Sequence, residues 1–386
     1  MSSGLLIYGR QQFFRLPNTN SIFIYQPKFS SLTKAPHPLF YTQQINTKKM
    51  PVTILLLIVG FALLIKGADV LIEGSASIAK RFGVSPLIIG ITIVGFGTST
   101  PELITSVIAA LQNESALVLG NVIGSNIANV ALILGITSLI APLAVTNLTI
   151  IRELPFTIAS SVAMIILIFD RLFADGENFF SRGDGMIMML FFFIFIYFTV
   201  TSIIAERKKN KRIKKQVKEI AAEVSAPPVG SIGRSIGFVI VGLAGVMGGG
   251  YLVVNSAVEI ATAFELSKTF IGLTIIAVGT SLPELVTSAV AAFKKETDLA
   301  VGNIVGSNIF NLLFVLSLSG ILAPFKIDPN TIVDAGIMTV IMIFLFVFAL
   351  TRKVITRWEG GVFFALYVLT MGFVIIREVN GFDFLI

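Results

Sequence analysis

The chain has 386 residues, of which 55% are hydrophobic and 13% are charged, with a mean hydropathy of +0.89 and no cysteine. This composition excludes a soluble globular protein, which carries far more charge, and the lack of cysteine excludes disulfides, thiolate metal sites and cysteine nucleophiles. The formal net charge of +7 gives no indication of nucleic-acid binding, because residues 1–49 contain six basic and no acidic residues and leave only +1 on the remainder.

Residues 1–49 have no helical apolar period and contain scattered proline, serine, threonine and asparagine. We predict a disordered or non-native N-terminal extension, since Met50 precedes an apolar run and would serve as a start. A transit-type targeting segment is the alternative, because the composition is basic and free of acids. The only histidine, His37, lies in this segment and outside the apolar region.

Ten apolar stretches follow, and each is long enough to cross ~30 Å of hydrocarbon as a helix. They lie near residues 51–79, 85–112, 117–141, 148–170, 184–205, 233–262, 268–293, 298–323, 331–351 and 357–377.

Spans two and three carry unexpected polar residues. Span two contains Gly97-Thr98-Ser99-Thr100-Pro101-Glu102, and span three contains Gly120-Asn121-Val122-Ile123-Gly124-Ser125-Asn126-Ile127-Ala128-Asn129. An ionised side chain at the bilayer centre costs ~2.5–3.5 kcal/mol, so Glu102 is predicted to be functional. Pro101 lacks an N–H and clashes with the carbonyl of Gly97, which predicts a broken helix whose freed backbone lines a buried or wet cavity.

A basic segment follows span five. Eight of the thirteen residues from Glu206 to Lys218 are Lys or Arg, which predicts a cytoplasmic linker and places both ends of the ten-span core outside. We interpret the basic run as a topology signal and a solvated helix face. Binding of acidic lipid headgroups is the alternative.

The polar motifs return in spans seven and eight, 182 residues later and without a gap. Between residues 97–142 and 279–324, 22 of the 46 paired positions are identical, and Pro283 and Glu284 repeat the break and the carboxylate. The chain therefore contains an internal duplication.

An odd number of spans separates the two copies, so they cross the membrane in opposite directions. Inverted repeats with paired broken helices are typical of secondary transporters, whose site lies near the midplane. The sequence predicts an all-α membrane protein with ten transmembrane helices in two inverted five-helix repeats and breaks in helices 2 and 7. The predicted repeats are residues 51–205 and 232–378, joined by the linker at 206–231.

The motifs supply a set of candidate ligand oxygens. They are the carboxylates of Glu102 and Glu284, the hydroxyls of Thr98, Thr280, Ser125 and Ser307, the amides of Asn129 and Asn311, and the carbonyls of Gly95 and Ala277. Ca²⁺ takes ~6–8 oxygen ligands in irregular geometry, whereas transition metals prefer His or Cys, which the spans lack. We therefore expect a hard cation as cargo, no resident cofactor and no catalytic residue.

The spacing within span three and span eight supports this set. Ser125 and Asn129, and likewise Ser307 and Asn311, lie four residues apart on one helix face. The glycines are expected to let these helices approach the broken ones closely. They are Gly120, Gly124, Gly302 and Gly306. The other asparagines are interpreted as interhelical hydrogen-bonding residues: Asn121, Asn126, Asn303 and Asn308.

The paired glutamate motifs and the paired Gly-Ser-Asn-Ile motifs resemble the alpha repeats of the cation/calcium exchanger superfamily, most closely the sodium/calcium exchangers of prokaryotic type. The resemblance covers about residues 51–378. It implies that the residues named above bind Na⁺ and Ca²⁺ alternately in a multi-pass protein of a prokaryotic plasma (inner) membrane, without a protein partner. Many relatives carry Asp where Asn311 stands, and this departure counts against K⁺ cotransport.

The leading hypothesis is a secondary antiporter that exchanges Na⁺ for Ca²⁺ by alternating access. A Ca²⁺ (or other cation)/H⁺ antiporter is an alternative, because two nearby carboxylates repel each other and protons can compete for them. A K⁺-dependent Na⁺/Ca²⁺ exchanger and a passive channel are further alternatives. An intramembrane enzyme is disfavoured, because the spans offer no catalytic Asp pair, Ser–His dyad or His cluster.

Overall fold

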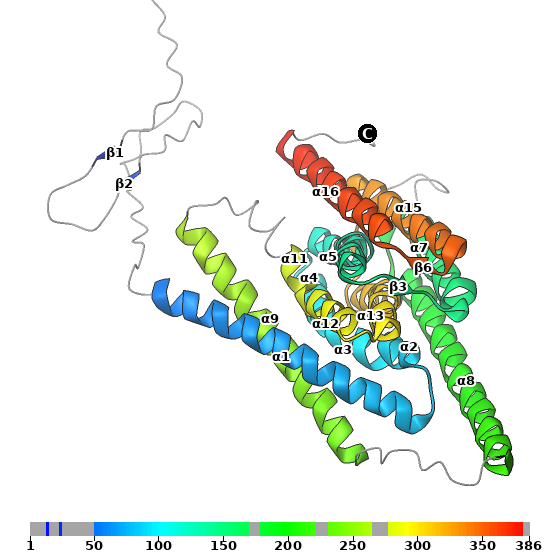
Figure 1. Ribbon diagram of the computed structural model, residues 1–386. Coiled ribbons are helices and arrows are strands. Elements are labelled where there is room, and N and C mark those ends of the chain that lie inside the picture. The colour runs from blue at the N-terminus through cyan, green and yellow to red at the C-terminus, as the bar shows by residue number, and fades with distance from the viewer. Residues whose placement is uncertain are drawn as a thin grey trace, which may run out of the picture. The chain divides into compact units, whose positions relative to one another are not determined.

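The computed structural model describes residues 13–14, 23–24, 50–169, 178–220, 231–264 and 277–380, and these are almost wholly helical (Figure 1). The chain divides into two compact units, Met1–Ile54 and Leu55–Ile386. In the first unit, the two-residue strands β1 (Phe13–Phe14) and β2 (Phe23–Ile24) pair antiparallel. The predicted extension at 1–49 falls mostly outside the described residues.

The first half of the membrane region follows the predicted order of spans. Its elements are α1 (Met50–Phe82), α2 (Pro86–Ile89), the π-helix η1 (Gly90–Val94), α3 (Gly95–Thr98), α4 (Thr100–Leu111), α5 (Ser115–Ile127), the π-helix η2 (Ala128–Leu134), α6 (Gly135–Ile140), β3 (Leu143–Ala144), the π-helix η3 (Thr149–Glu153), α7 (Leu154–Ile168), β4 (Phe179–Phe180) and α8 (Arg182–Ile220). The last of these helices continues well into the predicted linker.

The second half repeats this order. Its elements are α9 (Ile232–Ala263), α11 (Ala277–Thr280), α12 (Leu282–Phe293), α13 (Thr297–Phe310), the π-helix η6 (Asn311–Val315), α14 (Leu316–Leu322), β5 (Phe325–Lys326), α15 (Pro329–Arg352), β6 (Val354–Ile355) and α16 (Arg357–Asn380).

The helices have the length and apolarity that membrane spans require. Among the described residues, eight helices qualify by themselves, and the bent pair Pro86–Thr98 and Thr100–Leu111 qualifies together. Leu282–Phe293 is a shorter apolar helix, and residues 265–276, which would begin the predicted seventh span, lie outside the described ranges. The helical class and the paired breaks are as predicted, whereas the count of ten stays a prediction.

The first helices of the two repeats, α1 and α9, lie side by side (Figure 1). Glycines set this contact. A Cβ atom added at Gly67 would lie 2.6 Å from the backbone nitrogen of Val246, and one added at Gly242 would lie 2.6 Å from that of Leu71. The two backbones therefore approach as closely as small residues in membrane helices allow.

Two short strand pairs join the repeats reciprocally. β3 pairs with β6, and β4 pairs with β5, so the turn after each third span meets the turn between the fourth and fifth spans of the other repeat. Backbone hydrogen bonds extend both pairs, from Val145 N–H to the Lys353 carbonyl (2.8 Å) and from Ile327 N–H to the Asn178 carbonyl (3.0 Å). The turns thus hold these helices of the two repeats together.

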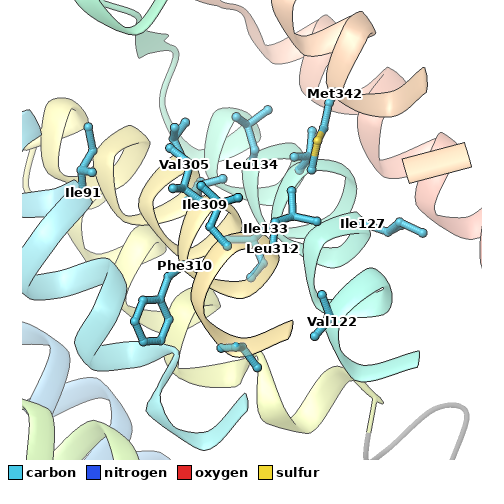
Figure 2. Close-up of a cluster of buried hydrophobic side chains, with 14 of the residues drawn as sticks. Ile91, Val122, Ile127, Ile133, Leu134, Val305, Ile309, Phe310, Leu312 and Met342 are labelled. Carbon is cyan, nitrogen blue, oxygen red and sulfur yellow. The ribbon is translucent and has the colours of Figure 1, made fainter. Parts of the chain in front are cut away.

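The helix α13 lies at the centre of the buried apolar cluster. Its side chains Val305, Ile309 and Phe310 are gathered with Ile91 of η1 and Ile133 of η2 (Figure 2). Contacts join α13 to η1, α3, α12 and η2, that is, to elements of both repeats. This packing fixes the polar residues of α13 against the first broken helix.

Candidate cation-binding site

Both predicted helix breaks are present. α3 and α4 meet at Ser99 (φ −82°, ψ 9°), where the two helical segments bend by 45°. α11 and α12 meet in the same way at Ser281 (φ −89°, ψ 6°). A proline occupies the first turn of each second segment, where a helix does not need its N–H. The breaks place Glu102 and Glu284 in the first turns of α4 and α12, where the helix dipole favours negative charge.

The two glutamates are each only 1% exposed and are bonded crosswise between the repeats. The Ser99 hydroxyl donates to Oε1 of Glu284 at 2.8 Å, and the Ser281 hydroxyl donates to Oε1 of Glu102 at 3.4 Å. The Oε2 atom of each glutamate is buried and has no hydrogen-bond partner among the described residues. No ion pair between described residues involves either glutamate. Because a buried carboxylate without a partner is costly, these oxygens indicate a cationic ligand.

Hydrogen bonds connect one half of the site. The Ser307 hydroxyl lies 3.1 Å from the Gly95 carbonyl oxygen and 3.4 Å from Oε1 of Glu284. The Thr98 hydroxyl lies 3.1 Å from Oδ1 of Asn303 and 3.4 Å from the same Gly95 carbonyl. Oxygen atoms from α3, α12 and α13 therefore converge on the Glu284 side.

On the Glu102 side, the equivalent hydroxyl groups make no such hydrogen bonds among the described residues. Ser125 and Thr280 correspond to Ser307 and Thr98 at the 182-residue register, and both hydroxyl oxygens are buried without a partner among the described residues. With Oε2 of Glu102, they are three buried oxygens that can serve as ligands. The segment before α11, residues 265–276, lies outside the described part of the chain.

The two predicted amide ligands occupy equivalent positions in π-helices. Asn129 lies near the start of η2, and Asn311 begins η6. Nδ2 of Asn129 donates to Oδ1 of Asn308 at 3.0 Å, whereas its own Oδ1 and both polar atoms of Asn311 have no partner among the described residues. Single π-helical turns are frequent at functional sites, and buried polar atoms without partners require an explanation.

The structure brings most of the predicted ligand residues into one buried region. The buried ones are Glu102, Glu284, Thr98, Gly95, Ser125, Ser307, Asn129 and Asn311. The remaining two, Ala277 and Thr280, form the ends of α11, which packs against α5. The identity of these ten residues as metal ligands stays a prediction, which their convergence supports.

Sequence reasoning missed two residues of this region, Ser99 and Ser281. Both stand at the helix breaks, and both donate to the glutamate of the other repeat. The signal was available, because each serine belongs to the duplicated Gly-Thr-Ser motif and the two are 182 residues apart. Nothing in the motif, however, indicates which carboxylate each hydroxyl faces.

The predicted close approach of span eight to the broken helix is present at Gly302, where an added Cβ would lie 2.5 Å from the Leu87 carbonyl oxygen. The equivalent contacts of Gly120 and Gly124 would involve residues 265–276, outside the described ranges.

Interhelical hydrogen bonds are present for three of the four remaining asparagines: Asn121, Asn303 and Asn308. For Asn126, Nδ2 donates to the Val122 carbonyl of its own helix at 2.7 Å, whereas Oδ1 is buried without a partner among the described residues. The interhelical role predicted for Asn126 therefore stays a prediction.

Comparison with known proteins identifies a family to which this chain is similar. A sequence model described as sodium/calcium exchanger protein matches residues 52–201 and 234–376. The sodium/calcium exchanger MaX1 of Methanosarcina acetivorans is 31% identical over 338 residues, covering 82% of this chain and 97% of that protein. The putative antiporter CaxA of Alkalimonas amylolytica is 39% identical over 279 residues, covering 72% of this chain and 83% of that protein.

A solved structure has the same fold. The sodium-calcium exchanger NCX_Mj, in a crystal soaked with Na⁺ and Sr²⁺, superposes with a TM-score of 0.69 at 30% identity, covering 84% of this chain and 98% of that one. The residues that the family model matches include both broken helices and both glutamates.

Proposed function

Because this chain belongs to the sodium/calcium exchanger family, a family of membrane transporters within the cation/calcium exchanger superfamily, we propose that it is a secondary antiporter that exchanges Na⁺ for Ca²⁺. The proposed site lies between Glu102 and Glu284, where the two broken helices meet. The other proposed ligands are the hydroxyls, amides and carbonyls named above.

The observation that carries this proposal is the pair of buried carboxylates, each with one Oε2 atom that lacks a partner among the described residues. Together they contribute a charge of −2, which one Ca²⁺ balances. Several Na⁺ ions, distributed over the surrounding oxygens, can also balance it. Both kinds of ion at once would leave excess positive charge in a medium of low dielectric constant, where repulsion is severe. The two ions therefore exclude each other.

Mutual exclusion at one site is the basis of exchange. The empty site, with its two charges, is costly to carry through the membrane, so access should switch sides only when the site is loaded. Ca²⁺ bound from one side then leaves on the other when Na⁺ replaces it. Inverted repeats provide two equivalent halves that can open alternately.

Asparagine at both 129 and 311 supports exchange without K⁺. A third carboxylate would be needed to balance an additional monovalent cation beside Ca²⁺, and neither position supplies one. Protons remain competitors for Glu102 and Glu284, so a proton-coupled exchanger is the second candidate.

The protein is a multi-pass integral membrane protein. We place it in a prokaryotic plasma (inner) membrane with both ends of the core outside, as the basic run at 207–218 and the bacterial and archaeal relatives favour.

The test is calcium flux in proteoliposomes loaded with Na⁺, K⁺ or choline, with and without a pH gradient. We expect uptake only against internal Na⁺, unchanged by K⁺. An absolute need for K⁺ would contradict the argument from Asn129 and Asn311. Full uptake driven by a pH gradient without Na⁺ would establish the proton-coupled alternative instead, and flux without any counter-ion would indicate a channel.

A further inference from the structure

We propose that Asn121 and Asn303 are positioning residues that hold the two glutamate-bearing helix turns in place and so set the cation affinity of the site. This inference rests on the proposed function. It assigns a role to two side chains that do not belong to the predicted ligand set.

Asn303 bonds to the turn that carries Glu284. Its Nδ2 lies 3.3 Å from the backbone carbonyl oxygen of Glu284 and 2.9 Å from the Ser288 hydroxyl, four residues further along α12. Its Oδ1 accepts from the Thr98 hydroxyl of the other repeat at 3.1 Å. Asn303 is completely buried, so water does not compete for these bonds.

Asn121 makes the same two-point contact in the first repeat. Its Nδ2 donates to the backbone carbonyl of Glu102 at 3.0 Å and to the Ser106 hydroxyl at 2.8 Å. Asn121, Glu102 and Ser106 each have their counterpart 182 residues later, so the whole arrangement is duplicated with the glutamates. Because the contact is duplicated together with the glutamates, we infer that it serves the site and is not a packing contact of one repeat alone.

The position of the contact gives it a function. α4 and α12 begin directly after a break, so the position of each glutamate depends on how its first helical turn is held. An amide that holds the carbonyl of the glutamate and a hydroxyl one turn later fixes this turn against the following span. The carboxylate is then pre-organised, and the cation does not have to order it on binding.

A neighbouring asparagine shows that the sequence motif alone does not produce such a contact. Asn126 is completely buried and lies in the same helix as Asn121, yet its Nδ2 bonds to the Val122 carbonyl of that helix and its Oδ1 has no partner among the described residues. Asn126→Ala is therefore the control, since it removes an amide of the same chemistry that makes no hydrogen bond to α4 among the described residues.

The experiment compares Asn121→Ala, Asn303→Ala and Asn126→Ala in purified protein. Apparent Ca²⁺ affinity, maximal exchange rate and melting temperature are measured for each. We expect the affinity to fall at least about tenfold for the first two variants, because Asn121→Ala loses two hydrogen bonds of modest net strength and Asn303→Ala loses three, and to change less than about twofold for the control. A purely structural role would lower the melting temperature of all three and leave the affinities alike.

Double-mutant cycles test whether each asparagine acts through the serine hydroxyl to which it bonds. Ser106→Ala should weaken Ca²⁺ binding in the wild-type background and have no further effect in Asn121→Ala, because the hydroxyl acts through that amide. Ser288→Ala and Asn303→Ala form the equivalent cycle. Additive losses in both cycles, or wild-type affinity in both asparagine variants, would overturn the proposal. If the wild-type protein exchanges another cation, the proposed function fails, and the same comparison with that cation still decides the role of the asparagines.

Discussion

The Ser99 hydroxyl donates a 2.8 Å hydrogen bond to Oε1 of Glu284, which belongs to the other repeat. The equivalent bond from Ser281 to Glu102 is longer, at 3.4 Å. Each carboxylate is thus oriented by the helix break of the opposite repeat, so the breaks and the charges form one unit. A movement of either broken helix must change the ligand geometry on both sides of the site.

Replacement of Glu102 or Glu284 by Gln should abolish exchange and leave membrane insertion intact. Each substitution removes one of the two charges that balance Ca²⁺ and keeps the size of the side chain. The measurement is calcium flux in proteoliposomes, together with a monodisperse profile in gel filtration. Glu73→Gln, at an exposed position of α1, is the control and should retain full flux. Wild-type calcium flux in either variant would show that the replaced glutamate is not a ligand in the site.

Ser99→Ala should weaken Ca²⁺ binding more than Ser281→Ala does. A hydrogen bond to a charged group contributes about 1.5–3 kcal/mol, so loss of the 2.8 Å bond should lower the affinity by at least about tenfold. The 3.4 Å bond is weaker and its loss should cost less. Ser99→Thr keeps the hydroxyl and should restore most of the affinity. Equal losses in the two alanine variants would show that the bonds have equal strength in the binding state.

Gly302→Ala should destabilise the protein. The added Cβ would meet the backbone carbonyl of Leu87 at 2.5 Å, and a backbone cannot rotate away as a flexible side chain can. Overpacking of this kind costs about 1–3 kcal/mol, which thermal unfolding in detergent can detect. Gly336→Ala on α15 is the matched control, because the described residues leave open space around that position. An unchanged melting temperature for Gly302→Ala would mean that α13 and α2 can separate at little cost.

The predicted orientation is testable because the chain has no cysteine. Lys211→Cys, in the basic run, should be protected from an impermeant maleimide in intact cells and should react after permeabilisation. Gln112→Cys, exposed at the end of α4, is predicted to lie on the outer side and should react in both cases. The opposite labelling pattern for both positions would reverse the topology.

The sequence by itself determined the class of protein and predicted the centre of its site. Charged residues in apolar spans are visible without a structure, because hydrocarbon excludes them unless they have a function. The constant 182-residue spacing identified the repeats, and the offset of five spans between equivalent helices gave their inversion. Pro101 and Pro283 indicated the breaks, because their effect on a helix is local and depends only on the neighbouring backbone.

Only the tertiary structure decided which groups meet. The pairs Ser99–Glu284 and Thr98–Asn303 join residues 185 and 205 positions apart, and each depends on how helices from different repeats cross. The sequence likewise made Asn121 and Asn126 look equivalent, whereas the Nδ2 of Asn121 bonds to α4 and that of Asn126 bonds to its own helix. A helical pattern specifies which residues share a face, but the helix that covers this face is chosen by the packing of the whole repeat pair.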